Sequence, residues 1–187
     1  MSNVRRQNPP STPTLQDCLM HTNAPTRIES KSTSAHGAKR IAAFFYGSFM
    51  RHEVMTLAGF QPITIEVAKL RGYDIDFDPH ANIFRSDQHS ICGILVYPSH
   101  EELNKMYARD GVGVFLPEAV IVETKDNRHL PAICYMPPTR GTQPADLAYV
   151  GRIIEAAQEH GFPSWYVNRL ESLRSNHQNR TASRTDA

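Results

Sequence analysis

The chain has 187 residues, of which 40% are hydrophobic and 21% are charged. These values fit one soluble globular domain with a core of its own, and two full domains would be cramped. Twenty Lys and Arg residues against 19 Asp and Glu residues give a formal net charge of only +1. Because this balance supplies no broad positive field, nucleic acid is not expected as the main partner.

Both ends of the chain are polar. Residues 1–40 are rich in Pro, Ser, Thr, Asn and Gln without a sustained apolar period, and residues 175–187 look equally solvated. Such segments cannot bury enough apolar surface to offset the entropy lost on ordering. We therefore predict disordered tails at residues 1–40 and 175–187 around a folded domain at residues 41–174. The basic first tail would also suit an organelle-targeting peptide, but its proline content and weak amphipathicity argue against that alternative.

No apolar stretch approaches the roughly 20 residues needed to cross a bilayer, and residues 1–40 contain no segment of signal-peptide type. Three cysteines cannot all pair within one chain. Cys92 and Cys134 lie in strand-like apolar runs, where a thiol usually serves as a small hydrophobe. We therefore expect a cytoplasmic protein with no membrane partner.

The first half of the folded part reads mainly as strands. The apolar run at residues 41–46 predicts a buried strand that is broken sharply by Gly47 and Ser48. Three more segments follow: a short helix or turn at residues 51–58, strand material at residues 63–77 that is interrupted at Arg71-Gly72, and a central strand at residues 90–97.

The second half mixes helices and strands. Ser99 and Glu102 have the spacing of a capping box, which predicts a helix over residues 100–109. Two further strands are expected at residues 119–123 and 130–135, on either side of an Asp126-Asn127 turn. A last helix is expected at residues 145–160, before Gly161. We predict an α+β fold with a curved or closed mixed β-sheet, or barrel, on which the helices pack.

The Gly47-Ser48 turn offers backbone N–H groups that have no ladder partner, and such groups bind carboxylates or developing oxyanions well. Ser48 adds a hydroxyl, and Tyr46 adds a phenol. At the other candidate position, Asp110 follows a predicted helix, where a carboxylate could point into a cleft. On chemistry alone an ordinary strand-ending turn and a solvated Asp110 remain the commoner explanations.

Other site types find little support. The nine histidines are never spaced as two ligands on one helix face, so no metal is predicted. Five of them are interpreted as surface residues: His80, His89, His100, His129 and His160. No Gly-x-Gly-x-x-Gly or Walker-type loop occurs, and no cofactor is implied.

Several segments, in order, resemble the γ-glutamylcyclotransferase-like (AIG2-like) family over residues 41–173. Residues 45–48 are similar to its aromatic-Tyr-Gly-Ser signature, and residues 70–77 and 81–97 are similar to its following strands. Residues 106–112 resemble the helix end that carries the catalytic glutamate, and residues 159–170 resemble its last helix. The joint order of these segments is more specific than any single motif.

The resemblance implies an enzyme that releases a γ-glutamyl group as 5-oxoproline when the α-amine of the substrate attacks its own γ-carbonyl. Asp110 would take the place of the glutamate as proton shuttle. The substrate-binding residues implied by the resemblance are Tyr46, Gly47, Ser48, Phe49, Tyr135 and Tyr149. The expected partner is a small γ-glutamyl amine or peptide, and the oligomeric state is left open.

Two departures from the family pattern bear on function. Asp110 is one methylene shorter than glutamate, and the aromatic residue after the catalytic loop is Phe115 in place of the usual Tyr. Glu118 is a second candidate carboxylate, although its position at a strand start favours a structural role. These departures leave two alternatives open: a non-catalytic γ-glutamyl or carboxylate-binding module, and an accessory protein of a biosynthetic pathway.

Overall fold

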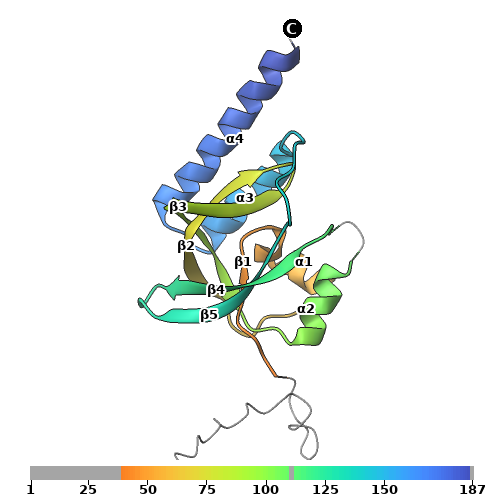
Figure 1. The fold of residues 1–187 in the computed structure, drawn as a ribbon, viewed down its shortest axis with the longest axis vertical. Coiled ribbons are helices and arrows are strands. Elements are labelled where there is room, and N and C mark those ends of the chain that lie inside the picture. Colours follow the sequence, from red (N-terminus) through yellow and green to blue (C-terminus); the bar gives the residue numbers. More distant parts are fainter. Residues whose placement is uncertain (1–38, 110–111, 186–187) are drawn as a thin grey trace, which may run out of the picture. The chain divides into compact units, whose positions relative to one another are not determined.

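The structure, a computed structural model, describes residues 39–109 and 112–185, and side chains up to residue 180. Five strands form a closed barrel in the order β1-β3-β2-β4-β5 (Figure 1). The strands are β1 (Ala43–Phe45), β2 (Glu66–Phe77), β3 (Ala81–Val96), β4 (Leu116–Thr124) and β5 (His129–Met136). The helices are the 3₁₀ helix η2 (Ser48–Met50), α1 (His52–Leu57), α2 (His100–Tyr107), α3 (Leu147–Glu159) and α4 (Ser164–Thr185). The predicted α+β fold with a closed mixed sheet is confirmed.

Strand β1 closes the barrel although it has only three residues, all buried. It pairs antiparallel with β3 and parallel with β5, so that Ala43 lies opposite both Val96 and Ile133. Closure of the barrel gives each of the five strands a neighbouring strand on both sides. The backbone turn that follows β1 is thereby held at one end of the barrel, between the ends of β3 and β5.

The hairpin of β2 and β3 is longer than the sequence indicates. The interruption expected at Arg71-Gly72 is a bulge within one continuous strand, where the pairing register shifts and Gly72 has a φ of 79°. Glycine adopts this left-handed conformation without steric cost. Strand β3 begins at Ala81, well before the predicted strand at residues 90–97. The prediction missed this part because residues 85–89 are polar and carry no apolar run.

The predicted capping box of α2 is present. The Ser99 hydroxyl accepts a 3.2 Å hydrogen bond from the Glu102 backbone N–H, and the Glu102 carboxylate accepts a 2.7 Å bond from the Ser99 N–H. Arg40, which falls in the predicted tail, donates to the same carboxylate at 2.7 Å and to the Tyr97 carbonyl. The folded part thus includes Arg40, and residues 1–38 of the predicted tail lie outside the described residues.

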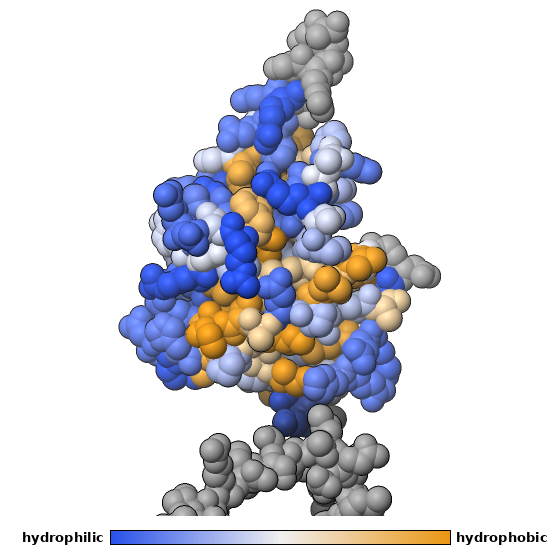
Figure 2. Space-filling model, viewed as in Figure 1, coloured by the Kyte–Doolittle hydropathy of each residue, from blue (hydrophilic) through white to orange (hydrophobic). Residues whose placement is uncertain are grey.

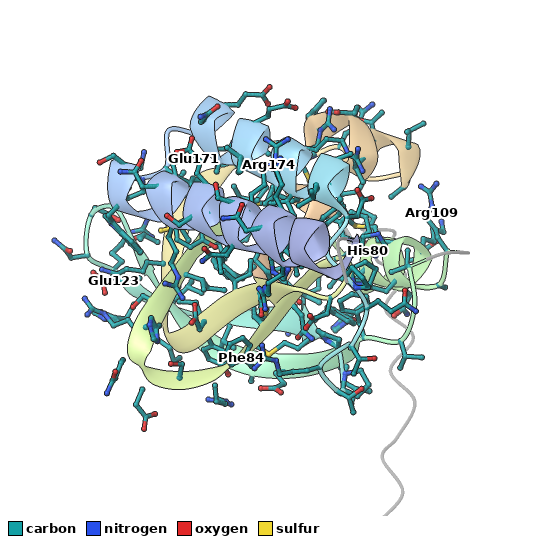
Figure 3. The ribbon with its side chains drawn as sticks, turned by 90° about the horizontal axis from the view of Figure 1, so that it is seen from above. His80, Phe84, Arg109, Glu123, Glu171 and Arg174 are labelled. Atoms are coloured by element: carbon teal, nitrogen blue, oxygen red, sulfur yellow. The ribbon has the colours of Figure 1, made fainter. Side chains whose placement is uncertain are left out.

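The prediction of a disordered tail at residues 175–187 is wrong for most of its length, because α4 continues to Thr185. Figure 3 shows α4 lying across the β2–β3 ribbon. The Arg169 guanidinium donates to both oxygens of the Asp74 carboxylate, and His177 Nε2 lies 2.7 Å from Asp76 Oδ1. Composition could not reveal these contacts, since each joins residues about 100 positions apart.

The contact between Asp76 and α4 makes the free energy of unfolding depend on pH in the acidic range. Burial raises the pKa of Asp76, but the hydrogen bonds from His177 and the Phe77 N–H, with the Arg140 charge, lower it below its ordinary value. The folded protein therefore binds fewer protons than the unfolded chain above the folded-state pKa, and this stability is lost as pH falls through that pKa.

We expect Asp76→Asn to lower the free energy of unfolding at pH 7 by about 1 kcal/mol, the usual net value of such a hydrogen bond. The difference from the wild type should shrink as pH falls below about 4, where the wild-type carboxyl also becomes neutral. Urea denaturation at a series of pH values measures this. A difference that stays constant down to pH 3 would contradict the explanation.

Apolar side chains are exposed on β4 and just before it. Val114, Leu116 and Ile121 are 70%, 51% and 58% exposed. Figure 2 shows apolar atoms gathered over the face on which β4 and β5 lie. Among the described residues, none of the helices is long and apolar enough to span a bilayer.

Candidate functional site

A cavity of about 230 Å³ lies where β1 ends. All six residues predicted to bind substrate line it: Tyr46, Gly47, Ser48, Phe49, Tyr135 and Tyr149. The remaining lining residues are Phe45, His80, Ala81, Tyr107, Val112 and Phe115. The lining therefore comes from the β1–η2 turn, the start of β3, the end of α2, β5 and α3, which are separated in sequence by up to about 100 residues.

The turn after β1 is held by hydrogen bonds. Strand β1 passes through Tyr46 and Gly47 directly into η2, where the Met50 N–H donates to the Gly47 carbonyl at 2.9 Å. The first N–H groups of such a helical turn have no partner within it and can bind an acceptor. The buried Tyr46 phenol donates a 3.0 Å hydrogen bond to the Tyr135 carbonyl, which ties the end of β1 to the end of β5.

Tyr46→Phe tests this tie. We expect the substitution to lower the free energy of unfolding by about 0.5–1.5 kcal/mol, because it removes one buried hydrogen bond and leaves a carbonyl without its donor. Urea denaturation measures the change. Tyr135→Phe is the matched control, since it keeps the backbone acceptor, and it should cost less. An equal or larger loss in Tyr135→Phe would count against a special role for the Tyr46 hydroxyl.

Gly47 allows the Tyr149 phenol to approach the turn closely. A Cβ atom at position 47 would lie 3.1 Å from the Tyr149 hydroxyl oxygen, a contact tighter than side chains usually make. Tyr149 is buried and lies in the first turn of α3. Asp146 caps this helix, because its carboxylate accepts hydrogen bonds from the Ala148 and Tyr149 N–H groups. Burial raises the pKa of the Tyr149 phenol, and hydrogen bonds from Ala81 and Ser48 only partly oppose this, so the phenol stays protonated at neutral pH.

One side of the cavity is a continuous group of aromatic rings centred on Tyr107, the last residue of α2. Its ring stacks on Tyr135 with centroids 3.9 Å apart and an interplanar angle of 14°. Phe49 and Phe115 lie 5.3 Å and 5.7 Å from it, at steeper angles. We call Phe49, Tyr107, Phe115 and Tyr135 the aromatic wall; each lines the cavity and is only partly buried.

His80 is a pocket residue that sequence reasoning missed. It is exposed, as predicted, but it also lines the cavity, and its ring centroid lies 4.7 Å from that of Tyr149. Figure 3 shows it on the same side of the molecule as Arg109, which follows α2. The Asp146 N–H donates to the Pro79 carbonyl at 3.0 Å, which holds the β2–β3 turn against the start of α3. No local sequence signal reports a contact between two such distant turns.

Of the two candidate carboxylates, Asp110 and Glu118, the structure describes only Glu118. Asp110 lies outside the described residues, while Tyr107 and Val112, the nearest described lining residues on either side of it in sequence, both face the cavity. Glu118 accepts hydrogen bonds from the Tyr73 hydroxyl at 3.3 Å and from the Arg85 guanidinium at 3.1 Å. None of the described lining residues is an acid. Glu118 thus has the structural role expected of it.

The buried thiols of Cys92 and Cys134 are expected to be unreactive. Burial raises the pKa of Cys92 to about 12, and it raises that of Cys134 further. A thiol with such a pKa is almost wholly protonated near neutral pH and is a poor nucleophile. Within the part of the chain that the structure describes, no group of three or more His, Cys, Asp or Glu residues could hold a metal ion.

Comparisons with curated proteins point to one kind of relative. No family model matches the sequence. The γ-glutamylcyclotransferase of Bos taurus is 25% identical over 147 residues, which cover 71% of this chain and 78% of the relative. That of Mus musculus is 22% identical over 147 residues, with the same coverage of both chains.

Solved structures share the fold. A γ-glutamyl cyclotransferase has a TM-score of 0.58 at 22% identity, covering 71% of this chain and 87% of that chain. A human protein described as uncharacterized has a TM-score of 0.62 at 23% identity, with the same coverage. YkqA of Bacillus subtilis has a TM-score of 0.60 at 23% identity, covering 73% of this chain and 54% of its own. The curated relatives and the shared fold together confirm the resemblance to the γ-glutamylcyclotransferase-like family.

Proposed function

We propose that this protein is an enzyme that releases a γ-glutamyl group as 5-oxoproline. The observation that supports this most is the cavity at the end of β1, in which the turn of Tyr46, Gly47 and Ser48 meets Tyr149. Curated relatives named γ-glutamylcyclotransferase support the same conclusion. The substrate would be a small γ-glutamyl amine or peptide.

The reaction needs positioned donors and one proton shuttle. The α-nitrogen of the γ-glutamyl group bonds to its own γ-carbonyl carbon and closes a five-membered ring, while the bond from that carbon to the amine nitrogen breaks. The attacking nitrogen loses a proton and the leaving nitrogen gains one, so no water, oxidant or cofactor is consumed. A carboxylate can perform both transfers, and we assign this role to Asp110.

The polar side of the cavity would hold the reacting group. Negative charge develops on the γ-carbonyl oxygen during attack, and preorganised donors stabilise it. The N–H groups at the start of η2, the Ser48 hydroxyl and the protonated Tyr149 phenol are the hydrogen-bond donors that we assign to this role. Tyr46 would act indirectly, since its hydroxyl is engaged with the Tyr135 carbonyl.

A second candidate function is a binding module that holds γ-glutamyl or carboxylate ligands without efficient chemistry. It is favoured by the replacement of the family glutamate by Asp110, because about 1 Å of misplacement can cost about a hundredfold in rate. Such a module could serve as an accessory protein of a biosynthetic pathway.

A panel of γ-glutamyl amides and peptides separates the two functions. We expect the wild type to release 5-oxoproline from at least one of them and Ser48→Ala to release it more slowly, by about 10²–10³-fold in kcat if the hydroxyl stabilises the oxyanion. Calorimetric titration with the same compounds measures binding separately. Binding without release would support the module and would count against the enzyme.

A further inference from the structure

The cavity has two sides of different chemistry, and only one of them is needed for the reacting group. Gly47, Ser48, Tyr149 and His80 form the polar side, and the aromatic wall forms the other. Resting on the proposed function, we infer that the amine half of the substrate is an uncharged aromatic amine that packs against the aromatic wall.

The aromatic wall has surface available for such a group. Its four rings form one connected patch around Tyr107, with centroid separations of 3.9–5.7 Å. Each of the four lines the cavity, and each is only partly buried. A further ring placed against this patch would add offset or edge-to-face contacts of the kind already present within it.

A carboxylate on the amine half is disfavoured at the same place. Among the described lining residues there is no Lys, Arg, Asp or Glu, and His80 belongs to the polar side. A carboxylate on the amine half, as in a γ-glutamyl amino acid, would lose its water of hydration against the rings without gaining a counterion. An uncharged ring meets no such cost.

A cationic amine is the strongest rival, because ammonium groups bind to the faces of aromatic rings. The most closely packed pair in the wall offers little of this surface. Tyr107 and Tyr135 are stacked with an interplanar angle of 14°, so the facing sides of their rings are covered by each other. This stacking removes one face of each of the two rings from contact with an ammonium group.

The test compares four γ-glutamyl amides that differ only in the amine: phenethylamine, ethylamine, glycine and 1,4-diaminobutane. We expect kcat/KM for 5-oxoproline release to be at least about tenfold higher for the phenethylamide than for each of the others, the low end of what apolar pocket contacts provide. Equal values, or a preference for the glycine or diaminobutane compound, would overturn the inference while leaving the proposed function intact.

A variant pair links the preference to the wall. Phe115→Leu should reduce the ratio of phenethylamide to ethylamide kcat/KM several-fold. Trp165→Leu is the matched control and should leave it unchanged, because Trp165 is an exposed aromatic residue outside this cavity. An unchanged ratio in Phe115→Leu would contradict the placement of the amine.

Absence of release from all four amides would reject the proposed function, and binding then decides the inference by itself. Calorimetric titration of the wild type with the same four compounds should give the lowest Kd for the phenethylamide. Equal or weaker binding of that compound would overturn the inference even in a protein without cyclotransferase activity.

Discussion

Asp110→Asn is expected to lower the rate of 5-oxoproline release by about 10²–10⁴-fold, the range that general acid–base groups contribute. The amide cannot take a proton from the attacking nitrogen or return one to the leaving nitrogen. Because asparagine has nearly the same shape, substrate binding should survive. The measurement is kcat and KM for the best substrate of the panel, together with the urea midpoint of both proteins.

Glu118→Gln provides the matched control for this prediction. It is the same change from carboxylate to amide, made at a residue that contacts Tyr73 and Arg85 and does not line the cavity. We expect its kcat to stay within about threefold of the wild type. If Asp110→Asn keeps full activity and Glu118→Gln loses it, the proton shuttle has been assigned to the wrong residue.

Among the substitutions proposed here, Gly93→Ala is expected to lower the free energy of unfolding the most. Gly93 lies on β3, and a Cβ atom there would overlap the Phe45 carbonyl oxygen and lie 2.6 Å from Phe44 Cζ. The oxygen belongs to the short closing strand β1 and cannot move aside as a side-chain end could. Overpacking of this kind costs about 1–3 kcal/mol or more. Since β1 leads directly into the Tyr46–Ser48 turn, 5-oxoproline release should fall as well.

Gly151→Ala is the control for the glycine prediction. Gly151 lies within α3, and its new Cβ would meet only the Arg174 guanidinium at 3.6 Å or more, an ordinary contact. We expect a gain in stability of up to about 1 kcal/mol, because alanine favours a helix over glycine. Urea denaturation of both variants makes the comparison. A loss in Gly151→Ala as large as that in Gly93→Ala would show that close backbone approach is not the cause.

Local sequence signals predicted much of the fold. The buried run before Gly47 is β1, the Ser99–Glu102 spacing is a capping box, and the Asp126-Asn127 turn joins β4 to β5. In each case the physical cause acts within a few residues: apolar periodicity, side-chain capping, or a turn residue such as Asn127, whose φ is 59°. The six proposed substrate-binding residues were named from the family resemblance, and all six line one cavity.

Long-range pairing produced the features that the sequence did not reveal. The polar part of β3 is a strand because β2 lies beside it, and α4 extends past residue 175 because Asp74 and Asp76 lie under its basic residues. His80 reaches the cavity for a similar reason, since a turn between two strands meets the start of α3.

The sequence by itself therefore determined the element types, the α+β class, the family resemblance and the residues of the β1 turn. Only the tertiary structure decided that the sheet closes through a parallel β1–β5 pair, that Tyr149 lies close to Gly47, and that four aromatic residues from η2, α2, the segment before β4 and β5 form one wall. The physical reason is that capping, turn and periodicity signals act over a few residues. Barrel closure and side-chain clusters depend instead on contacts between residues far apart in the chain, which no local pattern encodes.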